Sequence, residues 1–193
     1  MIIGITGGSG SGKTTLLTII REQGGLVLDC DAIYHQLLET DPTLLAAIET
    51  RFPGTVENGT LDRKKLGAIV FADESALLDL NRITHSAVHA EVLRRLQNAP
   101  ALAAVDAIGL FEGGLAPLCD VTVAVTAPVE DRIARLMARD GISEEYAKKR
   151  INAQHDDSWF REKCDHTLHN DGKLDAFATK CLAFLRQLAI MEA

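Results

Sequence analysis

The chain has 193 residues, with 27 acidic and 20 basic side chains and a formal net charge of −7. This length, with 47% hydrophobic residues, is typical of one soluble globular domain that needs neither disulfides nor a structural metal to fold. The acidic balance argues against a nucleic-acid-binding protein, which needs a basic surface to displace counterions from phosphates.

The N-terminus and the cysteines point to a cytoplasmic protein. No segment approaches the roughly 18 consecutive apolar residues of a membrane span, and the first residues lack the pattern of a cleavable signal. The four cysteines are widely separated and form no Cys-x-x-Cys pair, so we expect reduced, buried thiols: Cys30, Cys119, Cys164 and Cys181. A monomer is the default expectation.

Apolar runs that alternate with helical periodicity predict an α/β fold. A strand at 1–6 leads through a glycine-rich turn into a helix at 13–22, and a second strand follows at 26–28. This alternation indicates a mostly parallel, five-stranded sheet flanked by helices. The remaining core elements are strands at 101–105, 121–125 and 166–169, and a last helix from 174 to 188.

Two helical segments interrupt this pattern. Residues 32–99 have helical periodicity at 42–52, 62–72 and 74–98 and little strand signal, so we predict a helical substrate insertion there. Residues 128–159 contain a helix that breaks at Asp140-Gly141 and restarts after Ser143, a good N-cap. We interpret this segment as a lid. The core is then expected to comprise 1–31, 100–127 and 160–193.

Basic side chains on the expected lid allow two interpretations. Arg132, Arg135 and Arg139 share one helix face by their spacing, and Lys148, Lys149 and Arg150 follow on the next helix. A lid that closes over phosphates would use such side chains. For most of them, a solvated basic face is the simpler interpretation.

The sequence at residues 7–14 is Gly-Gly-Ser-Gly-Ser-Gly-Lys-Thr, which matches the phosphate-binding pattern G-x-x-x-x-G-K-[ST] between a strand and a helix. In such a loop the backbone N–H groups surround a phosphate, the lysine reaches the outer phosphates and the hydroxyl ligates Mg²⁺. We therefore expect an ATP site with Thr14 on Mg²⁺, formed by Gly8, Gly10, Ser11, Gly12, Lys13, Thr14 and Thr15.

Three aspartates follow predicted strands and should meet at the carboxyl edge of the sheet, where ligands bind in this class of fold. Asp31 could orient or deprotonate an acceptor hydroxyl, or it could cap the helix expected from residue 32. For Asp29 we favour a capping role. Asp106 could lie near Mg²⁺ through a water molecule.

Several short motifs resemble those of dephospho-CoA kinases, in the same order along nearly the whole chain. Besides the phosphate-binding loop, the most particular are Leu61-Asp62-Arg63, Phe71-Ala72-Asp73 and Leu110-Phe111-Glu112. The resemblance implies a P-loop kinase that transfers the γ-phosphoryl group of ATP to the ribose 3′-hydroxyl of dephospho-CoA, the last step of CoA biosynthesis.

The same resemblance implies roles for individual residues. Asp31 matches the family's base, Arg139 and Arg150 resemble lid arginines that close over phosphates, and Asn170 falls where a loop lies against the adenine. The positions near the acceptor are His85, Glu112 and, more weakly, Arg63.

This chain departs from the family pattern near the acceptor and the lid. Residues 106–112 lack the usual proline, and His85 is followed by Ser86. Gln154 is followed by His-Asp-Asp, where the family more often has a methionine- or proline-containing turn. The phosphoryl donor is thus better defined than the acceptor.

Other interpretations remain open. A nucleoside kinase of the uridine kinase type shares the glycine-serine-rich loop, and a regulatory protein could bind ATP without transferring phosphate. His85 and His89 lie four residues apart and could share a metal, although no Glu or Cys completes a site. Trp159 and Phe160 could stack on a base, but packing is the commoner use of such a pair.

Overall fold

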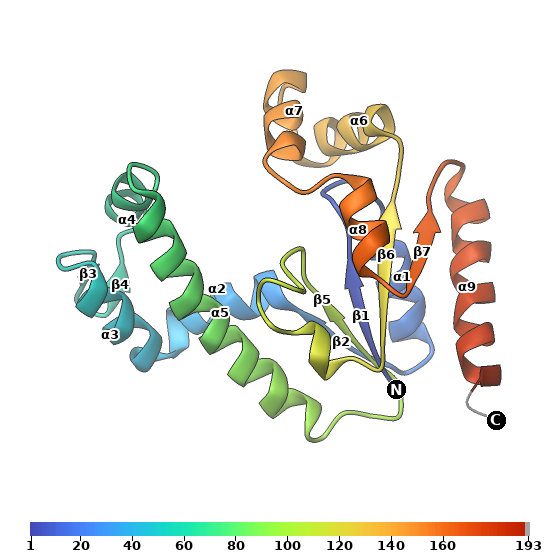
Figure 1. Cartoon of the computed structure of the whole chain (residues 1–193), viewed down its shortest axis with the longest axis horizontal. Helices are drawn as coiled ribbons and strands as arrows, with labels where there is room; N and C mark the ends of the chain where they lie inside the picture. The colour runs from blue at the N-terminus through green and yellow to red at the C-terminus, as the bar shows by residue number, and fades with distance from the viewer. Residues whose placement is uncertain (192–193) are drawn as a thin grey trace.

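A five-stranded parallel sheet forms the centre of the structure, a computed structural model that describes residues 1–191 (Figure 1). The strand order is β2-β5-β1-β6-β7, which confirms the predicted α/β fold. The strands are β1 (Ile2–Thr6), β2 (Leu26–Asp29), β5 (Ala103–Asp106), β6 (Val121–Thr126) and β7 (His166–His169). All of the sheet's pairings are parallel, so the carboxyl ends of these strands share one edge.

Helices α1 (Lys13–Glu22) and α9 (Leu174–Met191) pack against each other and cover one face of the sheet. Ile3 and Ile5 of β1 are fully buried among the apolar residues of these helices, including Leu16, Ile20 and Phe177. This burial places the amino end of α1, and the glycine-rich loop before it, at the carboxyl edge of the sheet.

The expected helical insertion contains α2 (Cys30–Thr40), α3 (Pro42–Arg51), α4 (Arg63–Val70) and α5 (Glu74–Leu96), which extend away from the sheet (Figure 1). It also contains a small hairpin that we did not predict, β3 (Val56–Glu57) and β4 (Thr60–Leu61). Asn58 and Gly59 form its two-residue turn with φ of 52° and 74°. An Asn-Gly pair is the strongest short hairpin signal, because both residues tolerate positive φ.

Helices α6 (Val129–Asp140) and α7 (Glu144–Asn152) lie above the carboxyl edge of the sheet, in the segment that we interpret as a lid from its sequence and call the lid segment (Figure 1). Ser143 caps α7 by accepting a hydrogen bond from the Tyr146 N–H, as predicted. A short helix, α8 (Asp157–Lys163), returns the chain to the sheet beside β6. The 3₁₀ turn η1 (Ala116–Leu118) precedes β6.

All four cysteines are free thiols, but only Cys30 and Cys181 are buried. Cys119 and Cys164 are half-buried, so the expectation that all four are buried was wrong for these two. Over residues 1–191, no helix combines the length and the apolar character needed to cross a membrane.

Candidate active site

The glycine-rich loop between β1 and α1 depends on backbone geometry that side chains rarely permit. Gly7, Gly10 and Gly12 have φ of 133°, 79° and 103°. A Cβ on Gly12 would also lie 2.3 Å from the Nδ2 atom of Asn170, so a side chain there is excluded twice. The loop then turns directly into α1, which begins at Lys13. This is the geometry of an anion-binding helix N-terminus.

Lys13 folds back over the loop, and its Nζ atom donates to the Gly7 carbonyl at 2.8 Å. Burial lowers the pKa of Lys13, whereas the carboxylates of Asp106 and Asp31 act to raise it. The ammonium group is therefore held in a partly desolvated position between the loop and two acidic side chains. It is free to exchange the Gly7 carbonyl for a phosphate oxygen.

Asp106 ends β5, where it lies opposite Ile5 of β1 and Asp29 of β2. Burial raises the pKa of this carboxyl to about 6, with Lys13 opposing the shift and Asp29 adding to it. Its Oδ1 atom is buried and has no hydrogen-bond partner among the described residues. A buried, unpartnered carboxylate oxygen beside a phosphate-binding loop suits Mg²⁺, which prefers oxygen ligands.

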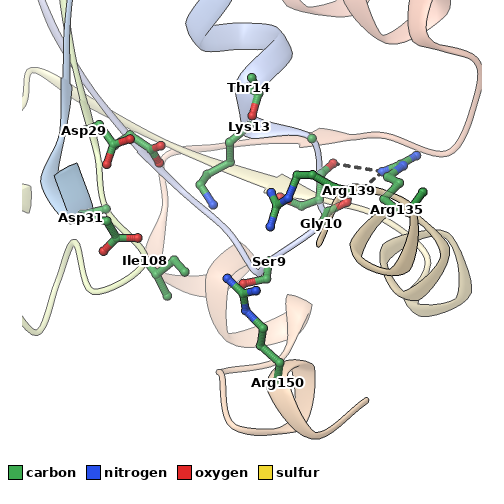
Figure 2. A pocket seen from close by; sticks show the side chains of 15 residues that line it. Ser9, Gly10, Lys13, Thr14, Asp29, Asp31, Ile108, Arg135, Arg139 and Arg150 are labelled. Carbon is green, nitrogen blue, oxygen red and sulfur yellow. Dashed lines mark hydrogen bonds between the residues drawn. The ribbon is translucent and has the colours of Figure 1, made fainter. Parts of the chain in front are cut away.

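A cavity of about 650 Å³ opens beside the loop, and its size is within the usual range for small-molecule sites. Figure 2 shows side chains from the loop, β2–α2 and the lid converging on it. Most of the predicted site residues line it: Gly10, Ser11, Gly12, Lys13, Thr14, Asp31, Asp106, Arg139 and Arg150. The tertiary structure therefore brings together groups that lie up to 140 positions apart in the chain.

A second cavity of about 250 Å³ adjoins the first. Asp31 lines both, together with Ala107 and Ile108. The rest of its wall mixes apolar and polar side chains, among them Tyr34, Leu80, Asn81, Thr84, His85 and Val88. Asp31 therefore lies where a molecule in one cavity would meet a molecule in the other.

Asp29 is the cap of α2, because its Oδ1 atom accepts from the Ala32 N–H at 3.0 Å. The helix starts at Cys30, two residues earlier than a cap at Asp31 requires. The capping alternative for Asp31 was therefore wrong, and the capping role of Asp29 is confirmed. Asp31 is exposed in the cavity.

Two lid arginines reach the first cavity and share one carboxylate. Arg139 donates to Asp140 through Nε at 2.6 Å and Nη2 at 2.9 Å. Arg150 of α7 donates to the same side chain at 2.8 Å. These hydrogen bonds, that of Arg139 foremost, hold the pKa of Asp140 below its usual range. Asp140 thus keeps two like charges together at the mouth of the cavity.

The solvated-face interpretation was wrong for two of the lid side chains. Arg132 is only 2% exposed, and its Nε donates to the Ser9 carbonyl at 3.0 Å. Arg135 donates to the Gly10 carbonyl at 3.1 Å. The sequence shows the periodic basic face of α6, but it does not show that this face packs on the glycine-rich loop. Lys148 and Lys149 do lie in solvent, where they pair with α7 glutamates.

The remaining predicted residues lie outside the two cavities. The Asn170 side chain is buried and donates to the Ser11 carbonyl at 2.9 Å, so it supports the loop from behind. Glu112 lines a groove next to His85. The Arg63 guanidinium lies 3.2 Å from the His35 ring. Gly8 contacts Arg132, where a Cβ would lie 2.0 Å from Nη2, and Thr15 follows in the first turn of α1. Their ligand-binding roles stay predictions.

Comparison with known proteins decides the family. The sequence model described as dephospho-CoA kinase matches residues 1–176. The chain belongs to the dephospho-CoA kinase family. It is 39% identical to the dephospho-CoA kinase of Deinococcus radiodurans over 97% of this chain and 92% of the relative. It is 34% identical to that of Bacillus cereus over 100% and 99%.

Solved structures agree with this assignment. TT1252 from Thermus thermophilus superposes with a TM-score of 0.81 at 34% identity, covering 97% of both chains. A dephospho-CoA kinase from Campylobacter jejuni gives a TM-score of 0.69 at 24% identity over 100% of this chain and 98% of that one, which supports the fold. The family predicted from the motifs is confirmed, and with it a kinase that uses ATP in CoA biosynthesis.

Proposed function

We propose that this chain transfers the γ-phosphoryl group of ATP to the ribose 3′-hydroxyl of dephospho-CoA, with Mg²⁺ bound and Asp31 as the base. The observation that carries the proposal is the position of Asp31, which lines both the cavity beside the phosphate-binding loop and the adjoining one. A donor phosphate in the first cavity and a hydroxyl in the second would meet at this carboxylate.

The donor side uses the loop and its neighbours. The loop N–H groups and Lys13 would bind the phosphates, and Asn170 would support the loop near the adenine. Thr14 and, through water, Asp106 would hold Mg²⁺; when bound, this ion neutralises charge on the outer phosphates. The buried, unpartnered Oδ1 of Asp106 supports this assignment.

On the acceptor side, the oxygen of the ribose hydroxyl forms a bond to the γ-phosphorus, and Asp31 accepts the proton that this hydroxyl loses. The bond from phosphorus to the β,γ-bridging oxygen breaks, and ADP leaves with that oxygen. Arg139 and Arg150, which share the Asp140 carboxylate, would stabilise the negative charge on the transferred group with their remaining N–H groups. The acceptor itself would contact His85 in the second cavity, with Glu112 in the groove that His85 also lines and with Arg63 beside His35.

We also propose that the enzyme works as a cytoplasmic monomer and does not bind nucleic acid. Its net charge of −7 supports the last point, because phosphate backbones would be repelled except at the local positive groups of the site. Sedimentation at working concentrations measures the oligomeric state.

The decisive test compares Asp31→Asn with Asp29→Asn. Both carboxylates line the first cavity, but asparagine at 29 still caps α2. We expect Asp31→Asn to lower the rate of CoA formation by about 10²- to 10⁴-fold, with ATP affinity retained in calorimetry. Asp29→Asn should stay within a few-fold of the wild type. Equal losses in both variants would overturn the assignment of the base.

The acceptor is tested with dephospho-CoA, uridine and adenosine in parallel, and the product is identified by mass. Conversion of uridine alone would favour a nucleoside kinase. ATP binding without transfer to any acceptor would favour a regulatory protein.

A further inference from the structure

The loop that follows β5 forms one wall of the second cavity. Residues 107–115 contain three glycines, and the cavity wall includes Ile108, Gly109, Gly113 and Leu115. Within the loop, the Gly113 N–H donates to the Gly109 carbonyl at 2.8 Å, and Leu110 is fully buried. Of the two residues that follow Leu110, Phe111 is half-buried and Glu112 is exposed, so the positions of these side chains depend on contacts from outside the loop.

Those contacts come from the end of the lid segment, more than 40 positions along the chain. The Nε2 atom of His155 lies 2.9 Å from the Oε1 atom of Glu112. The Trp159 ring meets the Phe111 ring edge to face, with centroids 5.8 Å apart and planes at 86°. His155 also stacks on Trp159, with centroids 3.8 Å apart and planes at 7°. Trp159 therefore orients His155 by stacking, and His155 in turn orients Glu112.

The stacked pair of His155 and Trp159 is held in place by the surrounding structure. Trp159 lies in α8, whose cap, Asp156, accepts from the Trp159 N–H at 2.9 Å. Its neighbour Phe160 is fully buried. At the start of the same segment, Gln154 is hydrogen-bonded to Ser9 of the phosphate-binding loop. Residues 154–160 therefore contact the donor loop at one end and the acceptor loop at the other.

We propose that His155 and Trp159 are positioning residues that hold the 107–115 loop, through Glu112 and Phe111, in the shape that receives the acceptor. This inference rests on the proposed function. Neither side chain lines the second cavity, so both act through the loop. The ring stack fixes the imidazole, and the imidazole and the indole then restrain two consecutive residues of a glycine-rich loop.

The test measures the acceptor and the donor separately. We expect His155→Ala and Trp159→Ala each to raise the KM for dephospho-CoA about 5- to 20-fold, the effect of losing one or two such contacts. The KM for ATP should change less than about 2-fold, because Phe111 and Glu112, the two loop residues that His155 and Trp159 contact, do not line the donor cavity. Trp159→Phe keeps an aromatic edge contact and should recover most of the loss.

Arg161→Ala is the matched control, since Arg161 lies exposed on α8 only two positions from Trp159. Trp159 is the only tryptophan in the chain, so its emission also gives a binding constant for dephospho-CoA without turnover. His155→Ala should weaken this binding by the same factor as it raises the KM.

The outcomes separate the two proposals. A wild type that binds and turns over dephospho-CoA, with unchanged acceptor KM in both alanine variants, overturns the positioning role alone. A parallel rise of both KM values also overturns it, because that indicates a general structural effect. A wild type inert toward dephospho-CoA overturns the proposed function. If the alanine variants do not fold, His155→Gln and Trp159→Leu, which keep side-chain volume but lose the ring stack, decide by the same split in KM.

Discussion

Gln154 meets Ser9 through two hydrogen bonds that together close one side of the phosphate-binding loop. The Ser9 N–H donates to Oε1 and the Gln154 Nε2 atom donates to the Ser9 Oγ, each at 2.8 Å. Ser9 is only 6% exposed, so its N–H and its hydroxyl depend on this partner. The end of the lid is thereby tied to the donor site.

Gln154→Ala should weaken ATP binding about 3- to 10-fold and lower the free energy of unfolding by about 1–2 kcal/mol, because two hydrogen bonds to a buried residue are lost. Calorimetry and urea unfolding measure the two effects. Ser9→Ala removes only one of the bonds and should show a smaller loss of stability. An unchanged ATP affinity in Gln154→Ala would show that the hydrogen bonds between Gln154 and Ser9 do not support the donor site.

Asp106→Asn should make the ligand-free protein more stable at neutral pH. The pKa of this carboxyl is raised to about 6, so its favourable contribution is complete below about pH 4 and is lost as the pH rises through 6. Above that window the buried charge costs up to about 3 kcal/mol, which asparagine does not pay.

The measurement is urea unfolding of Asp106→Asn and wild type from pH 4 to pH 8, without nucleotide or Mg²⁺. The free energy of unfolding of Asp106→Asn should exceed that of the wild type by an amount that grows between pH 4 and pH 6 and then stays constant at higher pH. Phosphoryl transfer should fall at the same time, since the carboxylate that we propose holds Mg²⁺ through water is lost. A gap that widens toward acid pH would show the opposite shift.

Asp140→Ala should separate the two lid arginines that share this carboxylate. Arg139 and Arg150 would then repel each other, and we expect the KM for ATP to rise about 3- to 10-fold. Stability should change by less than about 1 kcal/mol, because the ion pairs are largely solvent-exposed. Asp131→Ala on the same helix is the control: its pair with Arg135 spans 3.6 Å. A lower KM would mean that Asp140 competes with phosphate.

Arg132→Ala should be the most destabilising of these substitutions. The guanidinium is 2% exposed, and it donates to the Ser9 carbonyl and to Asp157. Its removal leaves a cavity and a carboxylate without its partner, for which we expect a loss of about 3–5 kcal/mol. Thermal unfolding measures this loss of stability. If Arg132→Ala loses no more stability than a substitution of an exposed arginine such as Arg161, Arg132 does not stabilise the loop through Ser9.

The sequence predicted much of the fold because its local signals agree with one another. The glycine-rich loop, the cap at Ser143 and the strand at His166–His169 all occur where local pattern placed them. The hairpin at Asn58-Gly59 carried an equally clear signal, but its strands are two residues each, too short for alternation to show. The half-buried Cys119 and Cys164 could not be distinguished from buried cysteines by composition.

The sequence by itself determined that a phosphate is bound, because the backbone conformation of a phosphate-binding loop requires glycines at fixed spacing, and that a carboxylate follows each of the neighbouring strands. Only the tertiary structure decided which arginines reach that loop. Arg132, Arg135 and Arg139 share one helix face by their spacing, yet Arg132 donates to the Ser9 carbonyl while Arg139 lines the cavity. Packing of α6 and α7 on the loop makes that choice, and periodicity within one helix carries no information about its neighbour.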